Sequence, residues 1–149
     1  NLELIGLLYH LSKEKSREIA TRLLEEVDLV ESSNKPVKTY SGGMKRRLDL
    51  AMSLIANPPI IFLDEPTKAL DGLGKNQIVK SLKTYQKQGG TVILVSHDME
   101  FCEQVADNMA MLFLGELVAI EPATDFFQRN YFYTTQRERI KKGLGLTKW

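Results

Sequence analysis

The hydrophobic pattern of this chain changes period near residue 57, and that change constrains the fold more than any other feature. Before it, apolar residues recur at helix spacing, as in Leu4–Leu11 and Ile19–Val30. After it come two short apolar runs, Ile60–Leu63 and Thr91–Val95, of the kind found in strands buried on both faces of a sheet. A helical pattern separates the two runs, so we expect a crossover helix and parallel pairing.

This order predicts an α/β fold in which a parallel sheet carries a helical subdomain at its N-terminal side. We expect a helical domain over residues 1–57, the rear part of an α/β core over 58–130, and a C-terminal tail over 131–149. Within the core, Met109–Leu114 and Glu116–Ile120 read as strands of a hairpin joined at Gly115. Phe101–Ala106 reads as a short helix before that hairpin.

Charge and composition exclude several classes of protein. The 149 residues include 20 basic and 19 acidic ones, for a formal net charge of +1, which gives no reason to expect a nucleic-acid partner. No apolar stretch approaches the length of a membrane-spanning helix. Cys102 is the single cysteine, and it fits a buried thiol in a reducing, cytoplasmic setting.

Two carboxylates follow the first apolar run directly. Open α/β sheets bind ligands at the carboxyl ends of their strands, so Asp64 and Glu65 are candidates for chemistry. Asp64 would hold Mg²⁺, directly or through water, and Glu65 would act as the general base toward an attacking water. The alternative is a strand that ends in an exposed acidic turn.

Three further segments are individually weaker signals. Ser41, Gly42 and Gly43 precede a helix expected over 43–56, where bare N–H groups could approach a phosphate; an ordinary helix cap is the more frequent reading. His97 follows the second strand and could contact a terminal phosphate, although a histidine at a strand end is more often structural. Asp71 begins the turn into the crossover helix, which is also the place of a simple cap.

Order and spacing connect these signals. Ser41 precedes Asp64 by 23 residues (64 − 41), which fits one helix, a turn and a strand. Glu65 precedes His97 by 32 residues (97 − 65), which fits the crossover helix and the next strand. Four modest signals therefore fall at connected strand ends and a helix start, as one nucleotide site requires.

Taken together, these segments resemble the motif set of ABC-type ATPases. Ser41–Met44 resembles the signature motif, Ile60–Glu65 the Walker B strand with its catalytic glutamate, Ala69–Asp71 the D-loop, and His97 the switch histidine. The resemblance implies a P-loop NTPase-like sheet, present in part, with ATP and Mg²⁺ as cofactors. It also implies catalytic roles for Glu65 and His97, and ATP contacts from Ser41, Gly42, Gly43 and Asp71.

The narrower resemblance is to the ATPases of energy-coupling-factor importers for vitamins and cobalt or nickel. It rests on the segments LVSHDMEFCEQVAD and FFQRNYFYTT. A drug- or lipid-exporter ATPase with a YSGGMKRRL signature is the competing subfamily.

The chain departs from the family pattern in several places. Met44 stands where Gln or Glu is frequent, Lys68 and Ala69 replace a small residue and a glycine, and Gly72 replaces a proline. No G-x-x-x-x-G-K-[ST] phosphate loop occurs, nor does the glutamine loop. We therefore expect very weak ATP binding by the isolated chain, and its start at Asn1 is typical of a cut inside a longer protein.

The resemblance implies a mechanism in which two ATPase subunits hold ATP between them and drive a transmembrane transporter subunit. The location would be cytoplasmic, peripheral on the inner face of the cell membrane. Two functions stay open: an importer ATPase domain seen as a fragment, and a noncatalytic module that only packs with a partner. An unrelated α/β binding domain is a third alternative.

Overall fold

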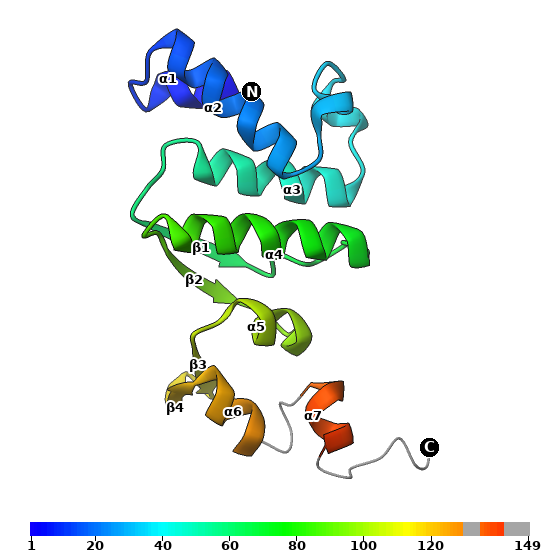
Figure 1. The fold of residues 1–149 in the computed structure, drawn as a ribbon, viewed down its shortest axis with the longest axis vertical. Coiled ribbons are helices and arrows are strands. Elements are labelled where there is room, and N and C mark those ends of the chain that lie inside the picture. Colours follow the sequence, from blue (N-terminus) through cyan, green and yellow to red (C-terminus); the bar gives the residue numbers. More distant parts are fainter. Residues whose placement is uncertain (130–134, 142–149) are drawn as a thin grey trace. The chain divides into compact units, whose positions relative to one another are not determined.

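The computed structural model describes residues 1–129 and 135–141. The chain divides into two compact units, Asn1–Ser96 and His97–Trp149. The first unit contains α1 (Leu2–Leu8), α2 (Lys13–Glu26), α3 (Gly42–Leu54), β1 (Ile60–Asp64), α4 (Gly72–Lys87) and β2 (Thr91–Val95), with 3₁₀ turns at Val30–Ser32 and Val37–Thr39 (Figure 1). The second contains α5 (Met99–Val105), β3 (Asn108–Phe113), β4 (Glu116–Pro122), α6 (Ala123–Arg129) and α7 (Gln136–Lys141).

Side-chain caps begin four of these helices. Ser12, Ser41, Asp71 and Asp98 each accept a hydrogen bond from the backbone N–H three residues later, at 3.2, 3.2, 2.8 and 3.1 Å. Such caps satisfy N–H groups that have no partner inside the helix. They fix where α2, α3, α4 and α5 start, and they confirm the predicted cap at Ser41.

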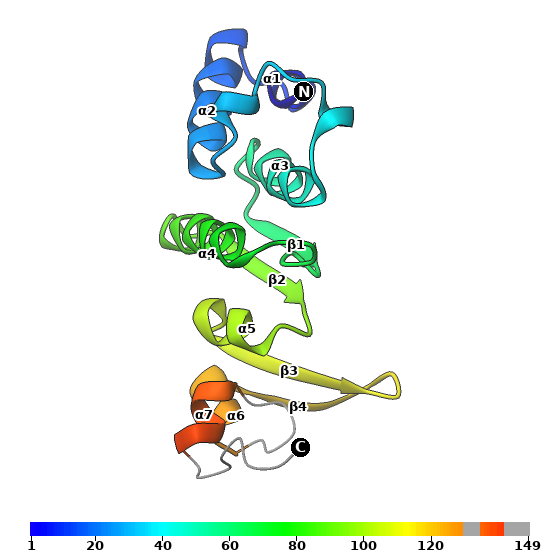
Figure 2. The same cartoon turned by 90° about the vertical axis from the view of Figure 1, so that its right-hand side faces the viewer.

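In the first unit, α4 lies beside α3 and packs on β2, while α2 contacts both helices (Figure 2). The core of this unit is apolar and comes from its helices and their connections. Its most deeply buried large side chains are Val27, Leu29, Ile55, Ile78 and Leu82.

The two strands of this unit pair in parallel, from Ile60 opposite Thr91 to Asp64 opposite Val95. The structure thus confirms the predicted α/β class and parallel pairing. The prediction that both faces of these strands are buried is wrong for the chain described. Side chains alternate along a strand, and Ile61 is 4% exposed whereas Phe62 is 73% exposed. Within the described residues, helices cover only the face that carries Ile61.

Tyr85 ties the end of α4 to the beginning of both strands. Its hydroxyl donates to the carbonyl of Pro58 at 2.6 Å, just before β1. Gly90, just before β2, lies against the Tyr85 ring so closely that any Cβ there would overlap the ring. A glycine is therefore required at residue 90, and this contact positions α4 over the sheet.

In the second unit, β3 and β4 form the predicted antiparallel hairpin. Its turn passes through Leu114 and Gly115, both with positive φ, at 49° and 83°. A bulge lies after Met111, and α6 packs on both strands. Part of the predicted tail, residues 131–134 and 142–149, lies outside the described residues, and the division at residues 57 and 130 stays a prediction.

Candidate functional site

The two candidate carboxylates lie where β1 ends. Asp64 is the last residue of β1 and is exposed. Glu65 follows, and its backbone N–H donates to the carbonyl of Val95 at 2.8 Å, which extends the pairing with β2 by one bond. Glu65 has φ of 45°, a left-handed conformation that is uncommon for residues other than glycine. The backbone therefore turns sharply just after the strand and separates the directions of the two carboxylates.

Ser96 is a neighbour of Glu65 that the sequence did not single out. Its hydroxyl donates to Oε2 of Glu65 at 3.4 Å, which is long for such a bond and therefore weak. Ser96 follows β2 directly, as Glu65 follows β1. With Asp64 paired to Val95, the parallel register alone would have brought these two side chains together.

The turn after Glu65 is held by its own backbone. The N–H of Lys68 donates to the carbonyl of Glu65, and that of Leu70 to the carbonyl of Thr67, both at 3.1 Å. Thr67 is buried, which anchors the middle of the turn. Asp71 ends the turn and caps α4 through its bond from the N–H of Gly74. The cap interpretation of Asp71 is thus confirmed, and its contact with nucleotide stays a prediction.

Ser41, Gly42 and Gly43 form the first turn of α3, beside the turn just described. Gly42 is exposed and Gly43 half-buried. A Cβ at Gly42 would lie 3.5 Å from the Cβ of Ala69, an ordinary contact, whereas one at Gly43 would lie 3.2 Å from the carbonyl oxygen of Ala69. The structure therefore brings the predicted signature and D-loop segments together within one unit.

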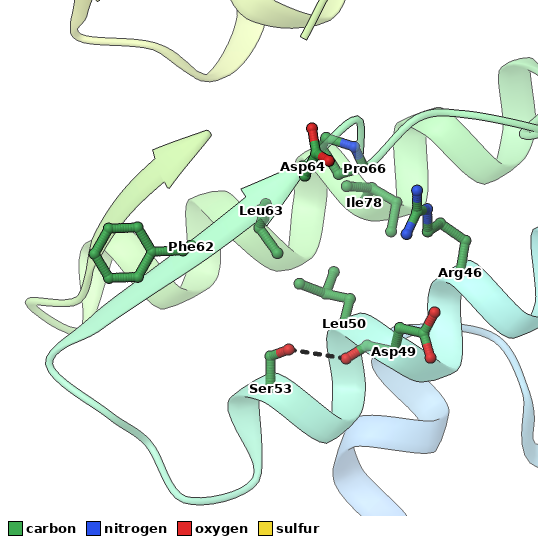
Figure 3. Close-up of a pocket in the computed structure, with 9 residues that line it drawn as sticks. All are labelled: Arg46, Asp49, Leu50, Ser53, Phe62, Leu63, Asp64, Pro66 and Ile78. Atoms are coloured by element: carbon green, nitrogen blue, oxygen red, sulfur yellow. Dashed lines mark hydrogen bonds between the residues drawn. The ribbon is translucent and has the colours of Figure 1, made fainter. Parts of the chain in front are cut away.

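A half-open cavity of about 230 Å³ lies between α3 and the end of β1. In Figure 3, Leu63 points toward Leu50 of α3, and Arg46 reaches in from the same helix. Asp64 stands at the end of the strand, close to Pro66. The lining residues are Arg46, Asp49, Leu50, Ser53, Phe62, Leu63, Asp64, Pro66 and Ile78. The cavity thus combines apolar walls with charged groups of both signs.

Arg46 and Arg47 are adjacent but do different things. Arg47 donates from Nη1 to the carbonyl of Val27 at 2.9 Å, to that of Asp28 at 3.1 Å, and to Oε1 of Gln77 at 2.8 Å. It fastens α3 to the end of α2 and to α4. Arg46 instead lines the cavity. The basic run in the sequence does not distinguish the two roles.

His97 opens the second unit, directly after Ser96, and the next residue, Asp98, caps α5. The catalytic role predicted for His97 stays a prediction. Among residues 1–129 and 135–141, His, Cys, Asp and Glu side chains nowhere gather in threes around a possible metal position. In the same described residues, no helix has the length and apolar character needed to cross a bilayer.

Comparison with known proteins places these segments in a family. The sequence model of the ABC transporter family matches residues 3–68, from α1 through Asp64 and Glu65. A daunorubicin resistance ATP-binding protein of Streptomyces coeruleorubidus is 44% identical over 119 residues, covering 80% of this chain and 38% of the relative. A linearmycin resistance ATP-binding protein of Bacillus subtilis (strain 168) is 36% identical over 129 residues, covering 87% of this chain and 42% of the relative. The chain therefore spans less than half the length of these relatives.

The narrower resemblance to energy-coupling-factor importers is not supported. The two relatives are named for drug resistance, and a doxorubicin resistance ATP-binding protein of Mycobacterium tuberculosis is also 36% identical over 129 residues. The first segment behind that resemblance belongs to β2, the start of α5 and their connection, which are general parts of the fold. The second falls partly on residues 130–134, outside the described ones. The broader assignment holds: this chain belongs to the ABC transporter family of ATP-binding proteins.

Proposed function

We propose that this chain supplies part of an ATP-hydrolysing site in a subunit that powers transport across a membrane. The observation that carries the proposal is the junction of two turns in one unit. An exposed, serine-capped glycine turn begins α3, and two carboxylates end β1. Ala69 and Leu70 hold the turn after the carboxylates against the glycine turn.

The residues present fit Mg²⁺ and ATP. Asp64 offers an exposed carboxylate, an oxygen ligand of the kind Mg²⁺ prefers. The first turn of α3 has an exposed Gly42 with room around it, which suits the approach of an anion to helix N–H groups. Bound Mg²⁺ would neutralise charge on the phosphates. Glu65 would accept a proton from the attacking water, and Ser41, Gly42 and Gly43 would donate to phosphate oxygens.

The rest of the assembly follows from the family. No phosphate loop occurs in these 149 residues, so most contacts to the triphosphate must come from other residues. We propose pairing with a second ATPase subunit and docking on a transmembrane subunit at the cytoplasmic face. The names of the relatives favour outward transport of drug-like compounds over the vitamin or metal uptake expected from the sequence.

Hydrolysis by the isolated chain is the first test. We expect very weak binding of ATP–Mg²⁺ and no measurable turnover, because the Gly-rich loop and its lysine are missing. The measurement is phosphate release, with Glu65→Gln as the matched control. Steady turnover that disappears in Glu65→Gln would show that the 149 residues are catalytically sufficient.

The role of Glu65 is tested in a complete subunit that contains this chain together with a phosphate loop. Glu65→Gln keeps the shape of the side chain but cannot accept a proton, so hydrolysis should fall by about 10² to 10⁴ while ATP binding is kept. Glu116→Gln, an exposed position on β4, is the control. Unchanged turnover in Glu65→Gln would remove the general-base role.

The signature turn is expected to serve the ATP of the partner subunit. In the same complete subunit, Gly42→Asp would place a carboxylate beside the incoming phosphate and add a Cβ where backbone must approach closely. We expect near-normal ATP binding by the single subunit but no ATP-driven dimer, both measured in the Glu65→Gln background. Loss of single-subunit binding, with dimerisation lost only in proportion, would mean that the turn acts on its own ATP.

The alternative function, a noncatalytic packing module, is favoured by one observation, the open apolar face of β1 and β2. The two functions give different results in the complete subunit. A packing module would associate with its partner equally well with and without ATP, and Glu65→Gln would change nothing.

A further inference from the structure

Leu70 lies between the first turns of two helices. Its Cδ2 would be 3.2 Å from a Cβ at Gly43 in α3 and 3.1 Å from a Cβ at Gly74 in α4. Separations this short are tighter than nearly all real Cβ contacts. Both helices therefore carry a glycine at the point where the Leu70 side chain touches them. We call this three-residue contact the Leu70 bridge.

Backbone bonds connect the Leu70 bridge to Glu65. The N–H of Leu70 donates to Thr67, and the N–H of Lys68 donates to the carbonyl of Glu65. The carbonyl of Ala69 meets the other side of Gly43, where a Cβ would lie 3.2 Å away. A displacement at the start of α3 must therefore move this turn or break one of its bonds, because packed groups at these distances do not compress.

Resting on the proposed function, we propose that Leu70 is a positioning residue that couples the Ser41–Gly43 turn to the Glu65 turn within one chain. A phosphate bound at the start of α3 would shift Gly43, press on Leu70 and the Ala69 carbonyl, and change where the Glu65 carboxylate sits. If the start of α3 serves the partner's ATP and Glu65 serves the chain's own, the bridge links the two ATP sites through a single subunit.

The two adjacent glycines allow a matched experiment on the 149-residue chain. Gly43→Ala adds a methyl against the bridge, whereas Gly42→Ala adds the same methyl one residue earlier, where only an ordinary contact at 3.5 Å is met. The readouts are amide hydrogen exchange at Lys68 and Leu70 and the carboxylate ¹³C chemical shift of Glu65. We expect exchange to rise about fivefold or more in Gly43→Ala and less than about twofold in Gly42→Ala.

A local effect must be separated from general loss of stability. The amide of Val27, bonded to Leu23 at 3.0 Å, reports on α2, and it should exchange at the same rate in both variants. The Glu65 ¹³C signal should move in Gly43→Ala alone. An equal rise at Val27, Lys68 and Leu70, or an unmoved Glu65 signal, would overturn the proposal.

The reciprocal experiment removes atoms instead of adding them, so it does not depend on Gly43→Ala folding. Coupling between two sites acts equally in both directions. Leu70→Ala should therefore shift the amide signals of Gly43 and Met44, and it should reduce the effect of a further Gly43→Ala change to about twofold. Unmoved signals at Gly43 and Met44 would show that Leu70 is only a filler. No nucleotide is present in these measurements, so their failure is distinguishable from failure of the ATPase assignment.

Discussion

The two faces of the β1–β2 sheet are made of the same residue types and meet different surroundings. On one face, Ile61 and Leu63 point to the helices of the first unit. On the other face, Ile60, Phe62 and Val95 are exposed in the chain described. Strands of parallel sheets are normally apolar on both sides because both sides are covered. The comparison shows that the residues of a strand record the surface it is suited to contact, while exposure depends on which neighbours are present.

The largest expected effect separates neighbouring residues of β1. Ile61→Ala should lower the free energy of unfolding by about 2–5 kcal/mol, because it leaves a cavity under the helices. Phe62→Ala, one residue later, should change it by less than about 1 kcal/mol, since little area is lost from the interior. Urea denaturation measures both. Equal losses would mean that the open face is covered in solution.

Association through the open face is the second test. A set of exposed apolar strand residues favours self-association, and the chain should form dimers or larger species at micromolar concentration. Phe62→Lys should weaken this association by at least about tenfold, since a charge must lose its water to enter the contact. Sedimentation velocity is the measurement, and Leu112→Lys, an equally exposed position on β3, is the control. A stable monomeric wild-type chain would contradict the prediction.

A smaller effect is expected from the contact that holds α4 on the covered face. Tyr85→Phe removes the hydrogen bond to Pro58 and should cost about 1 kcal/mol of unfolding free energy. Burial also raises the pKa of the Tyr85 hydroxyl above its ordinary value. The neutral phenol is therefore favoured in the folded chain. That stability is fully present below the unfolded pKa and is lost as pH rises through the raised one.

Tyr85→Phe should therefore lose stability less steeply than the wild type in the alkaline range. Denaturation in urea at pH 8 and at successive values above pH 10 checks this. Parallel curves for the two proteins would mean that Tyr85 ionises equally in the folded and unfolded chains.

The smallest expected effect lies outside both faces and sets a baseline. Ala69 has φ of 65°, which costs an alanine energy that a glycine avoids. Ala69→Gly should raise the unfolding free energy by up to about 1 kcal/mol, less the added freedom of the unfolded chain. Thermal denaturation is the measurement. A clear loss of stability would show that the alanine methyl makes a contact of greater value.

The parts of the fold that the sequence predicts are those that local chemistry decides. Ser41 caps α3 because a serine oxygen reaches an N–H three residues away, and the β3–β4 hairpin follows from a glycine between two apolar runs. The end of α3 was placed two residues late, at Ala56. The helix ends at Leu54, and Asn57 takes a positive φ of 45°, which an asparagine tolerates well.

The parts that could not be predicted depend on contacts between distant segments. Nothing local in Gly43 indicates that it must stay small for Leu70 rather than for a phosphate. In the same way, Arg46 and Arg47 are alike in sequence, and only the position of α2 turns Arg47 toward Val27. For the candidate site, the residue types indicate the chemistry, while their mutual support is visible only in three dimensions.

The two kinds of strand pairing also differ in the length of chain that each must close. Phe113 pairs with Glu116 across a turn of the hairpin, so β3 and β4 can associate in about 1–10 μs once both exist. Ile60 pairs with Thr91, 31 residues later (91 − 60). At ribosomal speeds of about 5–20 residues per second, β1 would wait roughly 2–6 s for its partner to be made. During that interval the apolar strand has an unpaired edge, so chaperone binding during synthesis should concentrate on Ile60–Asp64.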